Sequence, residues 1–184
     1  MKVPVRALAG LALIAALAGS TGSVFLSLGL GLVACPLCFY QRSFMLGALG
    51  VLVTTRLARD LVPAGAACLL VLPLVAGGLG VALFHVGLEL TGRLECPDGI
   101  FGLGSAPAQS LGAFVLLATL LVPAAVAAGG ARAALRTVAA VALGVLLAVA
   151  SVASAPPLPE ARVRPSKAEG YELQGCEPAP ARHP

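Results

Sequence analysis

Long apolar runs without a charged residue recur along this chain. An α-helix needs about 20 residues to cross the roughly 30 Å hydrocarbon core of a bilayer. Four charge-free runs reach that length, and they predict spans at about 7–29, 61–88, 99–131 and 137–159. A fifth run, 37–55, carries Arg42 near its start, where a long side chain can reach the interface. The sequence therefore predicts an all-α membrane protein with five transmembrane helices.

The composition agrees with this class and excludes others. Of the 184 residues, 59% are hydrophobic and 11% are charged, whereas a soluble domain is about half apolar and about a quarter charged. A soluble globular fold and a disordered chain are both excluded. The net charge of +4 comes from 12 bases and 8 acids spread thinly between apolar runs, which provides no basic surface for a nucleic acid. No nucleic-acid partner is expected.

Basic residues in the short connectors predict the orientation, because they remain on the cytoplasmic side. In a five-span arrangement six bases fall on one side: Lys2, Arg6, Arg56, Arg59, Arg132 and Arg136. That side, with the N-terminus, is expected to be the cytoplasm. The opposite side receives the loop around Cys35, the loop at about 89–110 and the tail from 155 onward. Seven of the eight acids lie there too.

The two ends of the chain differ in character: the N-terminal end is apolar and the C-terminal end is rich in proline. Lys2 and Arg6 precede an apolar run, and residues 32–35 resemble a lipoprotein cleavage box, so a cleaved signal is a competing interpretation. That apolar run is much longer than the 7–15 residues typical of a signal, and a retained first helix is the simpler account. The tail holds seven of the 14 prolines and is expected to be irregular. The predicted division is 1–154, a helical bundle with redox loops, and 155–184, a proline-rich tail carrying Cys176.

Cys35 and Cys38 form a C-x-x-C motif where an outer loop leads into the second span. The dipole of a helix N-terminus and a nearby cation both favour a thiolate. Arg42 follows Cys38 by four residues and so lies on the same helical face. A redox pair, a structural disulfide and a metal site remain as alternatives. Zinc needs four ligands, and the two histidines, His85 and His183, provide no second ligand pair by spacing, so no metal site is predicted.

Residues 35–42, C-P-L-C-F-Y-Q-R, resemble the C-x-L-C-x-x-Q-R signature of the DsbB family, the bacterial inner-membrane disulfide bond formation proteins. The resemblance extends over roughly residues 5–130. It implies a four-helix bundle that re-oxidises a periplasmic thioredoxin-like (DsbA-like) thiol oxidase. It also implies a membrane quinone, ubiquinone or menaquinone, as the electron acceptor.

The resemblance also implies roles for individual residues. Cys35 and Cys38 match the redox pair next to the quinone, with Cys38 as the thiolate that meets the quinone ring. Arg42 matches the arginine beside the quinone head group. Cys96 matches the cysteine that forms a mixed disulfide with the soluble partner.

One departure from the family pattern concerns the second outer loop, which holds two cysteines in the family but only Cys96 here. The fifth span returns the tail to the same side, so Cys176 is the predicted partner of Cys96. The alternative is that both are free or that Cys176 pairs elsewhere. Cys68, in the middle of the third span, is expected to be a buried, inert thiol.

His85 lies near the outer end of the third span. An ionisable residue within a span is a functional candidate, and at this level it could donate a hydrogen bond to a quinone carbonyl or relay its proton. A satisfied interfacial histidine is the alternative.

The sequence predicts a series of thiol–disulfide exchanges. A reduced partner attacks Cys96, the released Cys176 attacks the Cys35–Cys38 disulfide, and electrons pass from Cys38 to quinone. One rival is an enzyme resembling vitamin K epoxide reductase, in which the C-x-x-C comes late in the bundle. The other is a membrane scaffold or transporter subunit with structural disulfides, which the scarcity of polar groups within the spans disfavours.

Overall fold

The computed structural model describes residues 4–128, 132–156 and 173–178. Its elements are five α-helices, one 3-10 helix and two short strands: α1 (Val5–Leu28), α2 (Pro36–Leu57), α3 (Ala64–Leu90), β1 (Leu94–Glu95), η1 (Ile100–Gly102), α4 (Ala106–Ala128), α5 (Ala133–Ala153) and β2 (Glu177–Pro178). Each of the five described α-helices is long and apolar enough to cross a membrane. The predicted all-α membrane architecture is confirmed.

Several helix boundaries differ from the predicted spans; the fifth span, for example, is predicted at 137–159, whereas α5 runs from Ala133 to Ala153. At the starts of α3 and α4 local backbone geometry explains the difference. The fourth helix was expected from about residue 99, but it begins at Ala106. Phe101, Gly102 and Gly104 have positive φ angles, which a right-handed helix excludes. The third helix begins at Ala64 after Pro63, whose ψ of 146° is extended. The charge-free runs thus predicted where the spans lie, but turns within those runs set the residues at which α3 and α4 begin.

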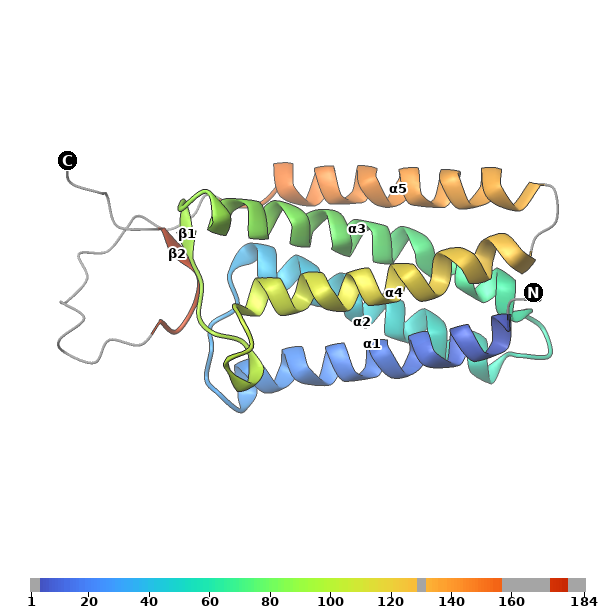
Figure 1. Ribbon diagram of the computed structural model, residues 1–184, viewed down its shortest axis with the longest axis horizontal. Helices are drawn as coiled ribbons and strands as arrows, with labels where there is room; N and C mark the ends of the chain where they lie inside the picture. The colour runs from blue at the N-terminus through green and yellow to red at the C-terminus, as the bar shows by residue number, and fades with distance from the viewer. Residues whose placement is uncertain (1–3, 129–131, 157–172, 179–184) are drawn as a thin grey trace.

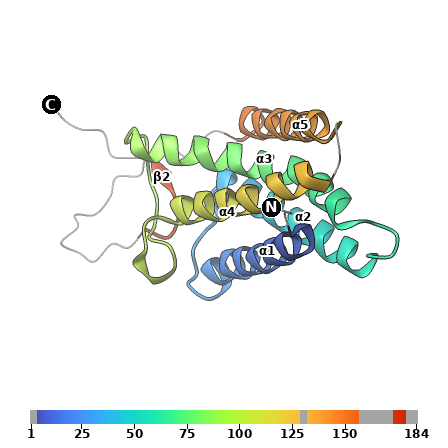
Figure 2. The same cartoon turned by 45° about the vertical axis from the view of Figure 1, so that its right-hand side comes forward.

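Helices α1 to α4 form a ring, and α5 packs outside the ring against α3 (Figures 1 and 2). Small residues allow this close approach. A Cβ added to Gly144 of α5 would lie 2.6 Å from the carbonyl oxygen of Pro73 in α3, and one added to Gly80 of α3 would lie 2.6 Å from the Ala148 Cβ. Membrane helices associate closely at such small residues because lipid supplies no hydrophobic force between them.

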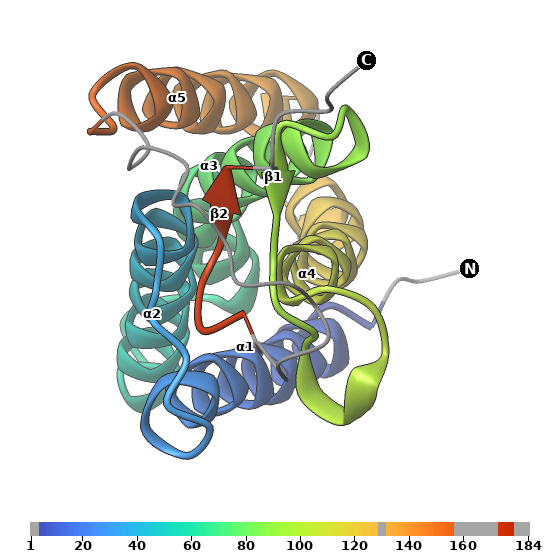
Figure 3. The same ribbon diagram turned by 90° about the vertical axis from the view of Figure 1, so that its left-hand side faces the viewer.

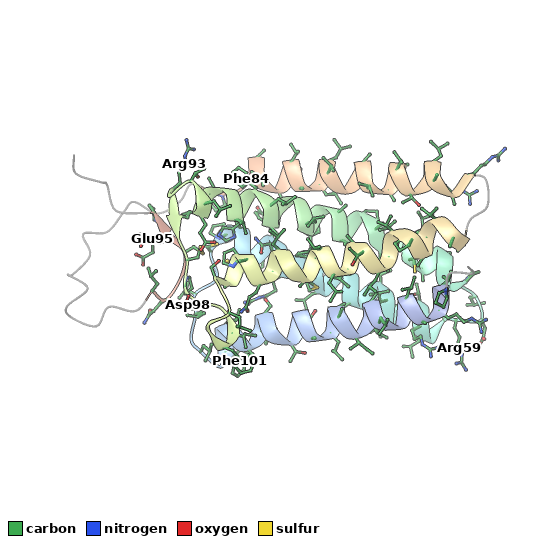
Figure 4. The ribbon with its side chains drawn as sticks, viewed as in Figure 1. Arg59, Phe84, Arg93, Glu95, Asp98 and Phe101 are labelled. Carbon is green, nitrogen blue, oxygen red and sulfur yellow. A yellow bond between two sulfur atoms is a disulfide. The ribbon has the colours of Figure 1, made fainter. Side chains whose placement is uncertain are left out.

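Consecutive helices run in opposite directions, so the bundle has two chemically different ends (Figure 1). The starts of α1, α3 and α5 lie at one end together with Arg59, while Glu95 and Asp98 lie at the other end (Figure 4). The connector from α1 to α2, the loop from α3 to α4 and the described part of the tail share that second end. Arg59, the last turn of α2 with Arg56 and the start of α5 with Arg132 are therefore at the opposite end from the cysteine-bearing loops, as the five-span arrangement requires. Arg93, in contrast, lies at the cysteine end (Figure 4). Which end faces the cytoplasm stays a prediction.

The tail can be followed only in part. Helix α5 ends at Ala153, next to the predicted boundary at 154, and residues 157–172 and 179–184 lie outside the described part of the chain. Viewed from the end of the bundle, β2 lies over the ring formed by α1 to α4 (Figure 3). Strand β2 pairs antiparallel with β1, with Leu94 opposite Pro178 and Glu95 opposite Glu177. This pairing brings the tail to the loop that carries Cys96.

Candidate redox site

The C-x-x-C motif is built on the first turn of α2. Cys35 is the N-cap residue, with an extended ψ of 164°, and Pro36 occupies the first helical position. Proline suits that position because its φ is already helical and the missing N–H would have no partner within the helix. The backbone N–H of Cys38 donates to the Cys35 Sγ at 3.2 Å. The Sγ atoms of the two residues lie 3.0 Å apart as thiols that share a hydrogen bond.

Cys96 and Cys176 are joined by a disulfide across 80 residues of sequence, as predicted. Backbone contacts hold the tail in place on both sides of this bond. The N–H of Val33 donates to the Gln174 carbonyl at 2.6 Å, and β2 pairs with β1. At Gly175 a Cβ would lie 2.8 Å from the Val33 carbonyl oxygen, so the tail approaches the α1–α2 connector more closely than a side chain allows.

The two cysteine pairs meet around one histidine. The Sγ atoms of Cys35, Cys38 and Cys176 and a ring nitrogen of His85 all lie within 4.8 Å of one another. His85 is fully buried, and its Nε2 is 3.8 Å from the Cys35 Sγ and 3.5 Å from the Cys96 Sγ. Four cysteines thus form a continuous path of sulfur atoms next to His85 of α3: Cys35 and Cys38 at the start of α2, Cys96 just after β1, and Cys176 in the tail.

Buried Gln41 completes this cluster. Its side-chain Nε2 lies 3.0 Å from His85 Nδ1, and only 3% of the residue is exposed. A buried polar side chain without a partner is costly, and here each of the two residues satisfies the other. Gln41 belongs to the quoted signature, yet sequence reasoning assigned it no role.

Hydrogen bonding at the helix start makes Cys35 acidic. Its pKa is lowered from 9.0 to about 5, chiefly by the hydrogen bond from the Cys38 thiol and further by His85 and the Cys38 N–H, against the opposing effect of burial. A thiolate at Cys35 is therefore the stable form near neutral pH. The thiolate that the sequence assigned to Cys38 refers to a different state, one with quinone bound, and stays a prediction.

A cavity of about 210 Å³ adjoins the C-x-x-C motif, and Cys38 forms part of its wall. Helices α1, α2 and α4, the α1–α2 connector and the loop before α4 form its walls, which are mostly apolar. Cys38 and Cys176 contribute its sulfur atoms, Gln41 and Gln109 its side-chain amides, and Arg42 its charged group. Within the described part of the chain, the residues that line this cavity include Cys38 but neither Cys35 nor His85.

Arg42 is anchored to α1. Its Nε donates to the Ser23 Oγ at 2.9 Å, and its second terminal nitrogen donates to the Ser23 carbonyl at 2.7 Å and to the Ser27 Oγ at 2.6 Å. None of these three acceptors is charged, so they orient the guanidinium without neutralising it. The sequence contained a signal for this contact: two serines four residues apart lie on one face of an otherwise apolar helix. That signal was missed.

The loop between β1 and α4 covers one side of the cavity. Gln109 holds it: the Ile100 N–H donates to its Oε1 at 2.9 Å, and its Nε2 donates to the carbonyls of Ile100 and Leu103 at 2.8 and 3.1 Å. Phe101, at the tip, is 93% exposed, and it points away from the bundle (Figure 4). Ser105 also donates to Glu89 of α3 at 2.7 Å.

Three cysteine sulfurs, those of Cys35, Cys38 and Cys176, and His85 match the four ligands that zinc takes in tetrahedral geometry. In the structure the Cys176 sulfur is already bonded to Cys96. Disulfide chemistry between neighbouring pairs accounts for the arrangement without a metal, and we therefore interpret the cluster as a path for thiol–disulfide exchange.

The family model described as "Disulfide bond formation protein DsbB" matches residues 5–111. This chain belongs to the DsbB family. The matched range contains Cys35, Cys38, Arg42, His85 and Cys96. A "Probable disulfide formation protein" of Chlamydia trachomatis serovar D is similar to it, with 30% identity over 114 residues that cover 56% of this chain and 82% of the relative. No solved structure matches the chain.

Membership in the DsbB family makes the chain a disulfide-generating membrane protein. The family match ends before most of α4 and before all of α5 and the tail. The cysteine that pairs with Cys96 therefore comes from a part of the chain beyond the matched range. Cys68, in contrast, is fully buried in α3, as expected of a structural thiol.

Proposed function

We propose that this chain is an inner-membrane thiol:quinone oxidoreductase that re-oxidises a periplasmic thioredoxin-like (DsbA-like) oxidase. The observation that carries the proposal is the sequence of contacts from the tail to the cavity. Cys96 is bonded to Cys176, the Cys176 sulfur lies within 4.8 Å of both Cys35 and Cys38, and Cys38 lines the cavity. Electrons that enter at one cysteine pair can therefore leave at the other.

Thiol–disulfide exchange proceeds through attack of a thiolate on a disulfide. A thiolate of the partner attacks Cys96, which forms the mixed disulfide and releases Cys176 as a thiolate. Cys176 then attacks Cys35, and Cys38 leaves as a thiolate. When the partner's second thiol releases Cys96, that cysteine attacks Cys176 and re-forms the original bond. The partner leaves oxidised, and Cys35 and Cys38 remain as a dithiol.

The structure holds the cysteines in the state at which this sequence ends, with Cys96 bonded to Cys176 and with Cys35 and Cys38 as thiols. Only the second pair must then be re-oxidised. A bridge at Cys96–Cys176 also occupies the position where the partner must attack, and Cys96 is partly exposed. The protein is thus ready for a new partner on one side while electrons leave on the other.

The cavity has the chemistry that a quinone head group requires. Its apolar walls suit a ring, Arg42 offers donors to a carbonyl oxygen, and the Cys38 sulfur reaches the same space. When bound there, a quinone supplies the two-electron acceptor for the Cys35–Cys38 dithiol. Arg42, anchored by Ser23 and Ser27, supplies fixed positive charge where negative charge gathers during that oxidation. His85 is not among the residues that line the cavity, so the contact between His85 and a quinone stays a prediction from the sequence.

The orientation follows from the separation of the two ends. We infer that the end carrying the cysteines and β1 faces the periplasm, where disulfides form and persist. The bases at the other end then face the cytoplasm.

The test is Cys38→Ser, with Cys68→Ser as the matched control because Cys68 is buried in α3 and does not line the cavity. Protein in detergent is supplied with a water-soluble ubiquinone analogue and dithiothreitol, and quinone absorbance is followed. Cys38→Ser should abolish quinone reduction above the protein-free rate, whereas Cys68→Ser should retain it. Continued turnover in Cys38→Ser would refute the proposal.

A further inference from the structure

The hydrogen-bond partners of His85 determine which ring nitrogen carries the hydrogen. The Gln41 side-chain nitrogen can only donate, so Nδ1, at 3.0 Å, accepts. The Cys96 sulfur is bonded to Cys176 and carries no hydrogen, so Nε2, at 3.5 Å, must donate to it. Both contacts require the same neutral tautomer, with the hydrogen on Nε2.

That N–H faces two sulfurs from different cysteine pairs. Nε2 lies 3.5 Å from the Cys96 Sγ and 3.8 Å from the Cys35 Sγ. Both distances are within the reach of a hydrogen bond to sulfur. His85 is fully buried, so water does not compete for the donor, and the surrounding low dielectric strengthens its interaction with an anion.

We propose that His85 is a catalytic residue of the exchange between the two cysteine pairs, in which its Nε2–H stabilises the thiolate on Cys96 and then on Cys35. The proposal rests on the proposed function, and it assigns His85 to the sulfurs instead of the quinone. Gln41 is a positioning residue, because it acts through the ring of His85.

The step concerned is the last exchange. The Cys96 thiolate attacks the Cys176 sulfur of the Cys176–Cys35 disulfide. The new bond joins Cys96 and Cys176, the bond from Cys176 to Cys35 breaks, and Cys35 leaves with the electron pair as a thiolate. One disulfide is exchanged for another, and no proton is gained or lost. Negative charge moves from the Cys96 sulfur to the Cys35 sulfur, and the Nε2–H of His85 lies beside both. The same donor can therefore stabilise the attacking thiolate and the leaving thiolate.

The acidity of Cys35 agrees with this role. His85 is among the causes that lower its pKa, after the Cys38 thiol. The sulfurs that the structure places around the ring are the free Cys35 and Cys38 and the disulfide-bonded Cys96 and Cys176. A donor that stabilises a leaving thiolate makes that thiol a better leaving group.

The exchange can be measured without quinone. Fully oxidised protein in detergent is mixed with one equivalent of dithiothreitol, quenched with acid, alkylated and analysed by mass spectrometry. The rate recorded is the appearance of the Cys35–Cys38 dithiol with the Cys96–Cys176 bond intact. A variant lacking both Cys96 and Cys176 measures direct reduction by dithiothreitol, which is subtracted.

His85→Leu should slow this exchange by about ten- to a hundred-fold, the factor that corresponds to losing one hydrogen bond to a charged group. His85→Gln retains a side-chain N–H and should recover part of the rate. Phe84→Leu is the matched control: Phe84 is the adjacent residue on α3, is 44% exposed, and should not change the rate. A His85→Leu rate within about two-fold of the unmodified protein would overturn the proposal.

A second measurement does not depend on substitution of His85. In a His183→Gln variant, His85 is the one remaining histidine, and nitrogen NMR of the labelled ring reports its tautomer. Hydrogen on Nε2 is expected, and hydrogen on Nδ1 would overturn the proposal. If the unmodified protein passes no electrons from Cys96–Cys176 to Cys35 and Cys38, the proposed function itself fails, together with this role. Unchanged exchange in His85→Leu removes the role of His85 alone.

Discussion

The low pKa of Cys35 leads to a prediction that separates the contribution of the neighbouring Cys38 thiol to this pKa from the contribution of the rest of the fold. Its pKa of about 5 lies four units below the reference value of 9.0. At pH 7 the thiolate fraction is therefore about 99%, against about 1% for an ordinary cysteine. The thiolate persists above the lowered pKa and is lost as the pH falls through about 5.

Reaction rate at a single pH would not reveal this shift. Thiolate nucleophilicity falls with pKa with a Brønsted coefficient of about 0.4–0.5, so four units cost a factor of about 40–100. That loss nearly cancels the hundred-fold gain in thiolate fraction. The thiolate itself must be followed, by its ultraviolet absorbance across a pH titration. The sample is a Cys68→Ser background in which Cys35 and Cys38 are reduced and Cys96–Cys176 is intact.

The perturbation is a matched pair of substitutions at position 38. The Cys38 thiol is the largest cause of the low pKa, so Cys38→Ala should raise the pKa of Cys35 towards its ordinary range. Cys38→Ser retains a hydroxyl donor and should fall between Cys38→Ala and the unmodified pair. A midpoint of 8–9 in the unmodified pair, or identical midpoints in all three proteins, would refute the reasoning.

Two further predictions concern packing and the loop. Gly144→Ala should lower the free energy of unfolding by about 1–3 kcal/mol, because its Cβ would lie 2.6 Å from the Pro73 carbonyl oxygen. Gly112→Ala is the control, because a Cβ added to Gly112 has no atom within 4 Å; it should leave the free energy of unfolding unchanged or raise it by about 0.5–1 kcal/mol. Equal thermal stabilities of the two variants in detergent would contradict the α3–α5 packing. Gln109→Leu removes three hydrogen bonds from the loop and should speed its cleavage in limited proteolysis, while unchanged cleavage would mean that Gln109 does not hold the loop.

The helical content could be predicted because lipid offers the backbone N–H and C=O groups no hydrogen-bond partners. Every N–H and C=O in the hydrocarbon must be satisfied within the segment, so a charge-free run of sufficient length becomes a helix. The same argument explains the errors. The run from 99 to 131 contains Phe101 and Gly102, and a turn there is satisfied by Gln109, a contact with a residue that hydropathy does not distinguish. Apolar content therefore predicted the existence of α4 but not its first residue.

The pairing of Cys96 with Cys176 could be predicted for a similar reason. An odd number of spans places both residues at the same end of the bundle, and the structure joins them. Spacing carried no information on this pair, since 80 residues separate the two. The number of spans, and not the sequence separation, therefore predicted that the two cysteines lie close together.

The class of the protein, its five spans, the shared end of the outer cysteines and the redox motif could all be predicted from local sequence. Each depends on a local property, either the length of an apolar run or the identity of residues 35–42. The contacts of His85, Gln41 and Ser23 could be found only in the three-dimensional arrangement of the helices. Their roles depend on distances between helices, since His85 in α3 meets Gln41 of α2 and sulfurs from α2 and the loop. An ionisable residue in a span indicates a function, but the side chains packed around it decide which atoms it serves.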